Sequence, residues 1–363
     1  SRNMILYPQM GDGVAPRDAR YRFQWNAPIL ISRHDPGVVY HASQYLHRTT
    51  DGGETWESLE GRFGFDNDVK YVTKIHASAT DPDVAYIAFT DHFHHDLSPY
   101  LFKTEDAGES WRSITGDLPP EAVVNAIAED PDNPDLLFAG IHNGLMISFD
   151  GGEHWARAGG IPPVSVNGIR IKDGDLVLGT YGRGFMIMDD IDFLAELDDQ
   201  VAEADAHLFS IREAEQYYRN NRTPPNRAAR WAGPNPEYGA LITYYLRGDA
   251  ASAEADAPAA SETDAPSEGQ EAEVPEVSIQ ILDAGGTVIR ELTGPDRAGF
   301  NRIAWDLRMN DPEAEADDEQ AEEQQGRRRP SFVDVEPGTY TVRLMARGME
   351  LSQRVTVVPD KRK

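Results

Sequence analysis

Thr49-Thr50-Asp51-Gly52-Gly53-Glu54-Thr55-Trp56 is a short turn motif, and related stretches occur at two later places in the chain. These copies are Thr104-Glu105-Asp106-Ala107-Gly108-Glu109-Ser110-Trp111 and Ser148-Phe149-Asp150-Gly151-Gly152-Glu153-His154-Trp155. An Asp carboxylate can accept N–H bonds within its own turn, Gly permits a positive φ, and Trp packs beneath. The repeat predicts a tight hairpin turn, here called the Asp-turn. Structural roles are expected for Asp51, Gly53, Trp56, Asp106, Gly108, Trp111, Asp150, Gly152 and Trp155.

A longer pattern of apolar runs repeats around the Asp-turns. An Asp marks each repeat, at positions 35, 81, 130 and 173, so the intervals are 46, 49 and 43 residues. Short strand-like runs flank each of these positions. A period in the forties with about four short strands per unit is typical of a β-propeller. The sequence therefore predicts about four blades over residues 25–192, with strands A to D in each blade. The last blade has no Asp-turn and no fourth strand.

The remaining segments predict a second domain. Residues 1–24 are predicted to be an entry segment. Residues 193–236 are predicted to form a short helix followed by a connector. Residues 237–363 hold short strands with a Gly285-Gly286 turn, which favours an immunoglobulin-like β-sandwich. Composition predicts disordered acidic insertions at 248–275 and 311–329. The predicted fold class is all-β, a partial β-propeller followed by this sandwich.

Composition narrows the possible partners. The chain has 62 acidic and 34 basic side chains, a net charge of −28, so it would repel nucleic acid and anionic membranes. Such a surface suits a halophilic protein, or else the two acidic insertions inflate the count. The absence of Cys excludes thiolate chemistry and Cys-based zinc sites. No apolar run is long enough to insert into a membrane, and no cofactor is predicted.

Several stretches resemble a known group of proteins. The Asp-turns are similar to the Asp-box, or bacterial neuraminidase repeat, of sialidases, xyloglucan-degrading propellers and sortilin-type (VPS10-like) receptors. Trp25-Asn-Ala-Pro-Ile and Leu178-Gly-Thr-Tyr-Gly-Arg-Gly-Phe-Met-Ile-Met-Asp-Asp resemble secreted bacterial proteins with a sortilin-like propeller, often labelled glycosyl hydrolases. Pro337-Gly-Thr-Tyr-Thr-Val-Arg-Leu resembles a flagellar-hook-cap type of immunoglobulin-like domain. The resemblance implies a secreted, periplasmic or outer-surface location.

The resemblance also implies partners for the blades. Proteins of this group carry further blades at the N-terminal side, so this chain is expected to be a C-terminal fragment. Its blades would form an open arc, with Ile29–Ser32 at one end and Gly179–Met188 at the other. Open sheet edges are normally covered or closed. The expected partners are the missing blades, from a parent chain or a second subunit.

Ligand-binding residues are expected on the connections between strands B and C. Loops on a rigid scaffold carry function, and the B–C loops lie on the opposite face from the Asp-turns. Their polar and aromatic side chains make a candidate site for a peptide or glycan. The candidates are Tyr45, His92, His94, His95, His142, Asn143, Tyr181 and Arg183.

Two of these loops allow more than one interpretation. His92, His94 and Asp96 could hold a divalent metal, because imidazole and carboxylate are common ligands. Alternatively this is a solvated loop, and no metal is assigned. Arg183 could clamp a carboxylate, or it could pair with Asp189 or Asp190 to lock the last blade.

The sequence favours binding over catalysis. A glycosidase needs two facing carboxylates, and the sequence does not single out such a pair. It contains no nucleophile-elbow, phosphate-loop or zinc-protease motif. The predicted function is a secreted or cell-surface interaction propeller. The alternative is a sialidase-like or xyloglucanase-like glycoside hydrolase whose active site lies partly outside this chain.

Overall fold

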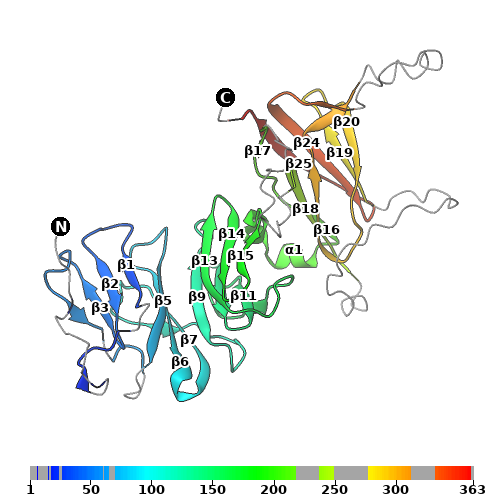
Figure 1. The fold of residues 1–363 in the computed structure, drawn as a ribbon. Coiled ribbons are helices and arrows are strands. Elements are labelled where there is room, and N and C mark those ends of the chain that lie inside the picture. The colour runs from blue at the N-terminus through cyan, green and yellow to red at the C-terminus, as the bar shows by residue number, and fades with distance from the viewer. Residues whose placement is uncertain are drawn as a thin grey trace, which may run out of the picture. The chain divides into compact units, whose positions relative to one another are not determined.

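The chain folds into two compact units, residues 1–191 and residues 192–363 (Figure 1). The computed structural model describes residues 27–59, 61–64, 70–217, 237–248, 277–311 and 332–360, with residues 6, 15 and 18–23. Apart from Gly248 and Asp311, the predicted insertions lie outside the described residues, as do Trp25 and residues 218–236 of the connector. No described helix has the length and apolar character that a membrane span requires.

The first unit consists of consecutive antiparallel meanders, each of which forms one blade. The first three have four strands, and the fourth, β13-β14-β15, has three strands in the described residues. This arrangement confirms the partial propeller of about four blades. The strands are β1 Ile29–Ile31, β2 Val39–Ala42, β3 Leu46–Thr49, β4 Glu57–Ser58, β5 Tyr71–Ala77, β6 Ala85–Asp91, β7 Asp96–Thr104, β8 Arg112–Ser113, β9 Val124–Glu129, β10 Leu137–Ile141, β11 Gly144–Ser148, β12 Ala156–Arg157, β13 Val166–Lys172, β14 Asp175–Thr180 and β15 Gly184–Met188.

The inner strands of successive blades run side by side in the same direction. Near the starts of β5 and β9, the Thr73 hydroxyl donates to the Val124 carbonyl at 2.9 Å. Just beyond their ends, the Ser78 hydroxyl donates to the Glu129 carboxylate at 2.6 Å. The start of β5 therefore lies beside the start of β9, and their ends lie beside each other, so the two strands are parallel. Because each blade is a meander, all B–C loops lie on one face of the unit and all Asp-turns on the other.

Apolar side chains fill the space between neighbouring blades. Tyr40 and Leu46 of the first blade share a buried cluster with Ile87 and Phe89 of the second. A second cluster joins the second and third blades through residues that include Tyr86, Leu101, Ile127 and Leu137. Strands β6 and β10 are buried along their whole length, which fits sheets that are covered on both faces.

The Asp-turns have the hydrogen bonding that their chemistry favours. The Asp51 carboxylate accepts the N–H groups of Glu54 at 2.8 Å and Thr55 at 2.9 Å, and the hydroxyl of Thr55 at 2.6 Å. Asp106 and Asp150 make the equivalent contacts in their own turns. The residue two positions after each Asp has a left-handed conformation, with φ of 90° at Gly53, 92° at Gly108 and 96° at Gly152. Trp155 is buried, whereas Trp56 and Trp111 are half-buried.

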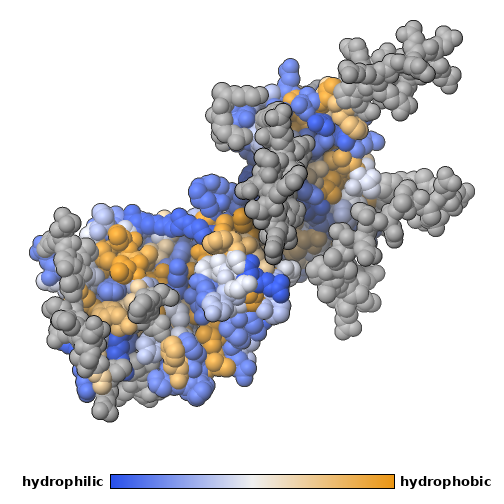
Figure 2. All heavy atoms as spheres, viewed as in Figure 1, coloured by the Kyte–Doolittle hydropathy of each residue, from blue (hydrophilic) through white to orange (hydrophobic). Residues whose placement is uncertain are grey.

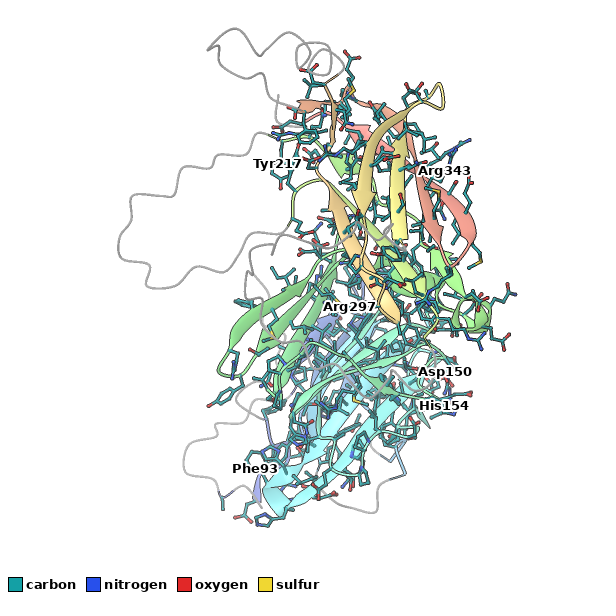
Figure 3. The ribbon with its side chains drawn as sticks, turned by 90° about the vertical axis from the view of Figure 1, so that its right-hand side faces the viewer. Phe93, Asp150, His154, Tyr217, Arg297 and Arg343 are labelled. Atoms are coloured by element: carbon teal, nitrogen blue, oxygen red, sulfur yellow. The ribbon has the colours of Figure 1, made fainter. Side chains whose placement is uncertain are left out.

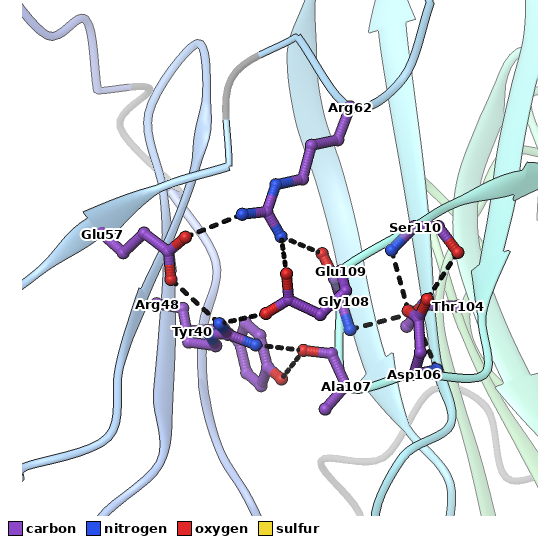
Figure 4. Close-up of polar contacts among 10 residues, drawn as sticks. All are labelled: Tyr40, Arg48, Glu57, Arg62, Thr104, Asp106, Ala107, Gly108, Glu109 and Ser110. Atoms are coloured by element: carbon purple, nitrogen blue, oxygen red, sulfur yellow. Dashed lines mark hydrogen bonds and ion pairs between the residues drawn. The ribbon is translucent and has the colours of Figure 1, made fainter.

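Each later Asp-turn also docks on the blade that precedes it. Figure 4 shows Arg48 of the first blade donating to the Ala107 carbonyl at 2.6 Å and to Glu109 at 2.7 Å. Arg62 donates to the Gly108 carbonyl at 2.8 Å, and Glu57 joins the two guanidinium groups. In the third turn the Trp155 indole donates to the Ile114 carbonyl at 3.1 Å. One motif thus closes a hairpin and links two blades.

The second unit is a β-sandwich whose sheets have the orders β16-β18-β21 and β17-β25-β24-β19-β20, with a small β22-β23 pair. Its core packs Tyr244, Ile279, Trp305 and Val342, among other apolar side chains. Its elements are η3 Asp192–Glu196, α1 Asp199–Glu203, β16 Ala206–Leu208, β17 Ala214–Glu215, β18 Ala240–Leu246, β19 Val277–Leu282, β20 Val288–Thr293, β21 Gly299–Trp305, β22 Arg308–Asn310, β23 Phe332–Asp334, β24 Gly338–Ala346 and β25 Met349–Val358.

The segment expected as helix and connector differs from its prediction. The helix is divided into a 3-10 turn, η3, and the single turn α1, because the Asp198 carboxylate accepts the Val201 N–H at 2.8 Å and begins a new helix there. Part of the connector belongs to the sandwich. Strand β16 pairs with β18, and β17 pairs in parallel with β25.

Two neighbouring glycines of the third Asp-turn give a matched test of this packing. A Cβ on Gly152 would lie 2.8 Å from the Ile114 Cβ, whereas on Gly151 its nearest atom would be 3.4 Å away. Both have positive φ. Gly151→Ala should cost about 1–2 kcal/mol from backbone strain alone. Gly152→Ala should cost about 1–3 kcal/mol more, because of overpacking. Denaturant unfolding of the two variants measures the difference, and equal losses would contradict the docking of this turn on the preceding blade.

Candidate functional site

The B–C loops and the Asp-turns occupy opposite sides of the first unit. Figure 3 shows Phe93, from the second B–C loop, well apart from Asp150 and His154 of the third Asp-turn. The B–C loops connect β2 to β3, β6 to β7, β10 to β11 and β14 to β15. They carry every ligand-binding residue expected from the sequence, so these residues share one face.

The four loops present their side chains to different degrees. Tyr45 is half-buried, whereas His142 and Arg183 are exposed, and Tyr181 is 79% exposed. Asn143 is held by Arg157, which donates to its carbonyl at 2.9 Å and to its side-chain oxygen at 3.2 Å. Arg183 makes no ion pair with a described residue, so the alternative lock on Asp189 or Asp190 is not formed.

The second loop is the most elaborate of the four. His92–His94 forms one 3-10 turn, and His95 ends it in a left-handed conformation with φ of 63°. His94 and the Asp91 carboxylate lie 2.5 Å apart through Nδ1 and Oδ1. The His92 and Phe93 rings lie with centroids 4.0 Å apart, and Tyr71 meets Phe93 edge-on at 5.3 Å. The turn thereby presents a ring cluster to solvent, with Phe93 57% exposed.

Lys70 contacts the two carboxylates that flank this loop, Asp91 and Asp96. Its ammonium lies 3.5 Å from the Asp91 carboxylate, 3.4 Å from Asp96 and 4.2 Å from the centre of the Tyr100 ring. Burial opposes the charge on Lys70, but the contacts with Tyr100, Asp91 and Asp96 raise its pKa. Hydrogen bonds from Tyr100 and Ser98 lower the pKa of Asp96. The two carboxylates therefore position the loop.

A metal at His92, His94 and Asp96 is not supported by this arrangement. Asp96 is directed to Lys70 and Tyr100, and His92 Nδ1 lies 3.0 Å from the Thr90 hydroxyl. Across the described residues, the group of three potential ligands with converging atoms is Asp150, Glu153 and His154. These three are exposed on the Asp-turn face. There the Asp150 carboxylate and His154 Nδ1 already bond each other at 2.7 Å.

The Asp-turn carboxylates are adapted to remain ionised. The hydroxyl and N–H of Ser110 are the largest causes that lower the pKa of Asp106 to about 2. Burial acts against ionisation of Asp150, but bonds from the backbone and side chain of His154 lower its pKa to about 2. The Asp150 carboxylate raises the pKa of His154 in return. These shifts come from bonds within the turn, which is a structural role.

Phe93 is the functional candidate that sequence reasoning missed. An apolar side chain in the polar run His92-Phe93-His94-His95 is the signal that could have found it, because no strand pattern continues there to bury it. With Tyr181 it gives the B–C loop face two exposed rings, and exposed imidazole and guanidinium groups lie on the same face. Such a face can stack on a flat or apolar ligand surface and donate hydrogen bonds at its edges.

Comparisons with known proteins find local likeness only, and no family model matches the chain. The xyloglucanase Xgh74A of Acetivibrio thermocellus is 28% identical over 146 residues, which cover 37% of this chain and 16% of that protein. A GH74 enzyme of Niastella koreensis is 19% identical over 45% of this chain and 22% of its own, with a TM-score of 0.34. YCF48 of Cyanidioschyzon merolae is 17% identical over 45% and 53%, also with a TM-score of 0.34.

Replacement of Lys70 tests whether this cation supports the second B–C loop. Lys70→Met leaves buried Asp91 without its ammonium partner and should lower the free energy of unfolding by about 3 kcal/mol. Lys70→Met/Asp91→Asn should recover part of that loss, because the stranded charge is gone. Lys172→Met is the control, since Lys172 is 64% exposed in its pair with Asp173. Urea unfolding measures the free energy of unfolding of each variant. If Lys70→Met lowers it by no more than Lys172→Met does, Lys70 does not stabilise the loop.

Proposed function

We propose that the first unit binds a polysaccharide through its B–C loop face and does not cleave it, within a secreted or cell-surface protein. The observation that carries the proposal is that two exposed rings, Phe93 and Tyr181, share the B–C loop face with exposed His142 and Arg183. Sugar rings have apolar faces and hydroxyl edges, which suit aromatic rings flanked by hydrogen-bonding groups. The local sequence likeness to a xyloglucanase supports a β-glucan as the first ligand to try.

The carboxylates near this face support binding over hydrolysis. A glycosidase needs one carboxyl with a raised pKa as its acid and a second, ionised carboxylate across the sugar. The pKa of Asp96 is lowered, and Asp91 contacts both Lys70 and His94. The alternative is a sialidase-like or xyloglucanase-like hydrolase with its site partly outside this chain. Release of reducing ends from xyloglucan, or of sialic acid from a sialoside, would favour that alternative.

Titration with soluble xyloglucan tests the proposed site. Phe93→Ala and Tyr181→Ala should each weaken binding about tenfold, because truncation of an exposed aromatic anchor costs about 1–2 kcal/mol. Phe149→Ala is the matched control, since Phe149 is 40% exposed but belongs to an Asp-turn on the opposite face. Equal affinities for all three variants would contradict the assignment. Binding of arrayed peptides with none of xyloglucan would indicate a peptide ligand instead.

We also propose that the two ends of the blade arc associate with further blades, from a longer chain or a second copy. Strand β1 exposes Ile29 and Ile31, which are 64% and 56% accessible, and β15 exposes Phe185 and Ile187, at 81% and 60%. Figure 2 shows hydrophobic side chains gathered over the region of β1. The equivalent strands of the third blade, β9 and β11, are almost fully buried. Exposed apolar patches of this kind mark interaction surfaces.

Sedimentation velocity over a range of protein concentrations tests this association. The isolated chain should self-associate, and Ile31→Lys with Phe185→Lys should shift it toward the monomer, because a buried charge opposes the contact. Phe149→Lys, on the Asp-turn face, is the control and should leave the distribution unchanged. A wild-type chain that stays monomeric at the highest concentration, or an unchanged distribution in the double variant, would contradict the proposal.

A further inference from the structure

A second site is formed where the four inner strands approach one another, away from the B–C loops. A cavity of about 240 Å³ is lined by residues from β5, β9 and β13, together with Leu30 of β1 and Arg33 just after it. Its lining includes His76 and Ala77 at the end of β5 and Glu129 at the end of β9. The cavity is therefore on the Asp-turn side of the unit, and every blade contributes to it.

Three cations from three different blades line this cavity. Arg33, Lys74 and Arg170 belong to the first, second and fourth blades, and none forms a hydrogen bond or ion pair with a described residue. Most other described Lys and Arg side chains of this unit have carboxylate partners. These are Arg48, Arg62, Lys70, Lys103, Arg112 and Lys172. In a chain with 62 acidic and 34 basic residues, three unpaired cations at one cavity are an exception.

The one acidic residue of the lining bonds to neutral donors and forms no ion pair with these three cations. Glu129 is buried, and its carboxylate accepts the hydroxyls of Ser78 and Tyr86, both at 2.6 Å, and the Ala79 N–H at 3.3 Å. Neutral donors thus occupy both carboxylate oxygens. Three cations thus face one carboxylate in the lining, and like charges held together are unfavourable unless a further anion joins them.

The pKa of His76, which also lines the cavity, is affected by the same three cations. Burial lowers its pKa to about 4, and the charges of Arg33, Lys74 and Arg170 act in the same direction. Its Nε2 accepts the Glu129 N–H at 3.3 Å, so Nδ1 carries the proton of the neutral ring. At neutral pH the cavity lining therefore combines three cations, one carboxylate and a neutral imidazole.

We propose that this cavity binds a small multivalent oxyanion, of the phosphate or polycarboxylate type, held by Arg33, Lys74 and Arg170. Guanidinium groups match the paired oxygens of such anions, and a Lys adds a mobile point charge. The volume exceeds that of several waters at about 30 Å³ each, so it has room for the anion and part of its hydration shell. The bound anion would join three blades at their inner strands.

Titration calorimetry with inorganic pyrophosphate and, separately, with citrate tests the proposal. The wild-type chain should bind at least one of them, with an affinity that falls as salt is added. Lys74→Met and Arg170→Met should each raise Kd about tenfold, the loss expected for one charged hydrogen bond. Arg112→Met is the control, because Arg112 lies outside the cavity lining and outside the B–C loops and pairs with Glu105. Binding of only one probe identifies the ligand type, phosphate or carboxylate.

Two further measurements separate a binding role from a structural one. Without an anion, Lys74→Met/Arg170→Met should unfold at the same temperature as the wild type or higher, because repulsion is removed. In NMR titrations the pKa of His76 should rise when an anion binds, and in the double variant. The proposal is overturned if neither probe binds at millimolar concentration. Equal binding by the double variant would overturn it too.

Discussion

The Asp-turn carboxylate is the interaction on which the blades depend. Each turn places two consecutive residues at positive φ, Gly52 and Gly53 in the first copy and Ala107 and Gly108 in the second, so the strand ladder is interrupted there. The N–H groups that follow have no strand partner, and the Asp accepts them. An ionised acceptor forms stronger bonds than a neutral one, which allows the turn to persist in contact with water.

The same turns determine how blades are joined. A blade has little core of its own, because its sheet becomes buried only when a neighbour covers each face. The Arg48 and Arg62 contacts with Glu109 and the Trp155 contact with Ile114 fix where successive sheets meet. Burial is then almost complete for β9 and β11 of the third blade. It is incomplete for the equivalent strands β1 and β15 of the first and fourth blades, which in the described residues have a neighbouring blade on one side only. The exposed apolar residues at the two ends follow from the stacking that buries the middle.

The features that sequence predicted well are local ones. The Asp-turn is bonded within a few residues, and the blade period is visible as repeated spacing, so both could be inferred without a structure. Contacts between distant segments could not. Strands β16 and β17 are defined by pairing with β18 and β25, which their own residues do not encode. The cavity cations were missed because Arg33, Lys74 and Arg170 hold different positions in their repeats and converge only when the inner strands are assembled. The contacts of the loop that holds His92, His94 and Asp96 could not be inferred for the same reason, since nothing in the sequence places Lys70 between Asp91 and Asp96.

Charge distinguishes the two proposed ligand classes. A chain with a net charge of −28 repels anions over most of its surface. A neutral polysaccharide is not repelled and can approach the B–C loop face without an electrostatic penalty. Screening limits that repulsion to about 8–10 Å at moderate salt, a distance shorter than a blade is wide. An anion that reaches the surface can be retained only where cations are in local excess. Within the described part of the first unit, Arg33, Lys74 and Arg170 form such an excess, and the acidic surface around them raises the selectivity of that cavity by disfavouring anions elsewhere.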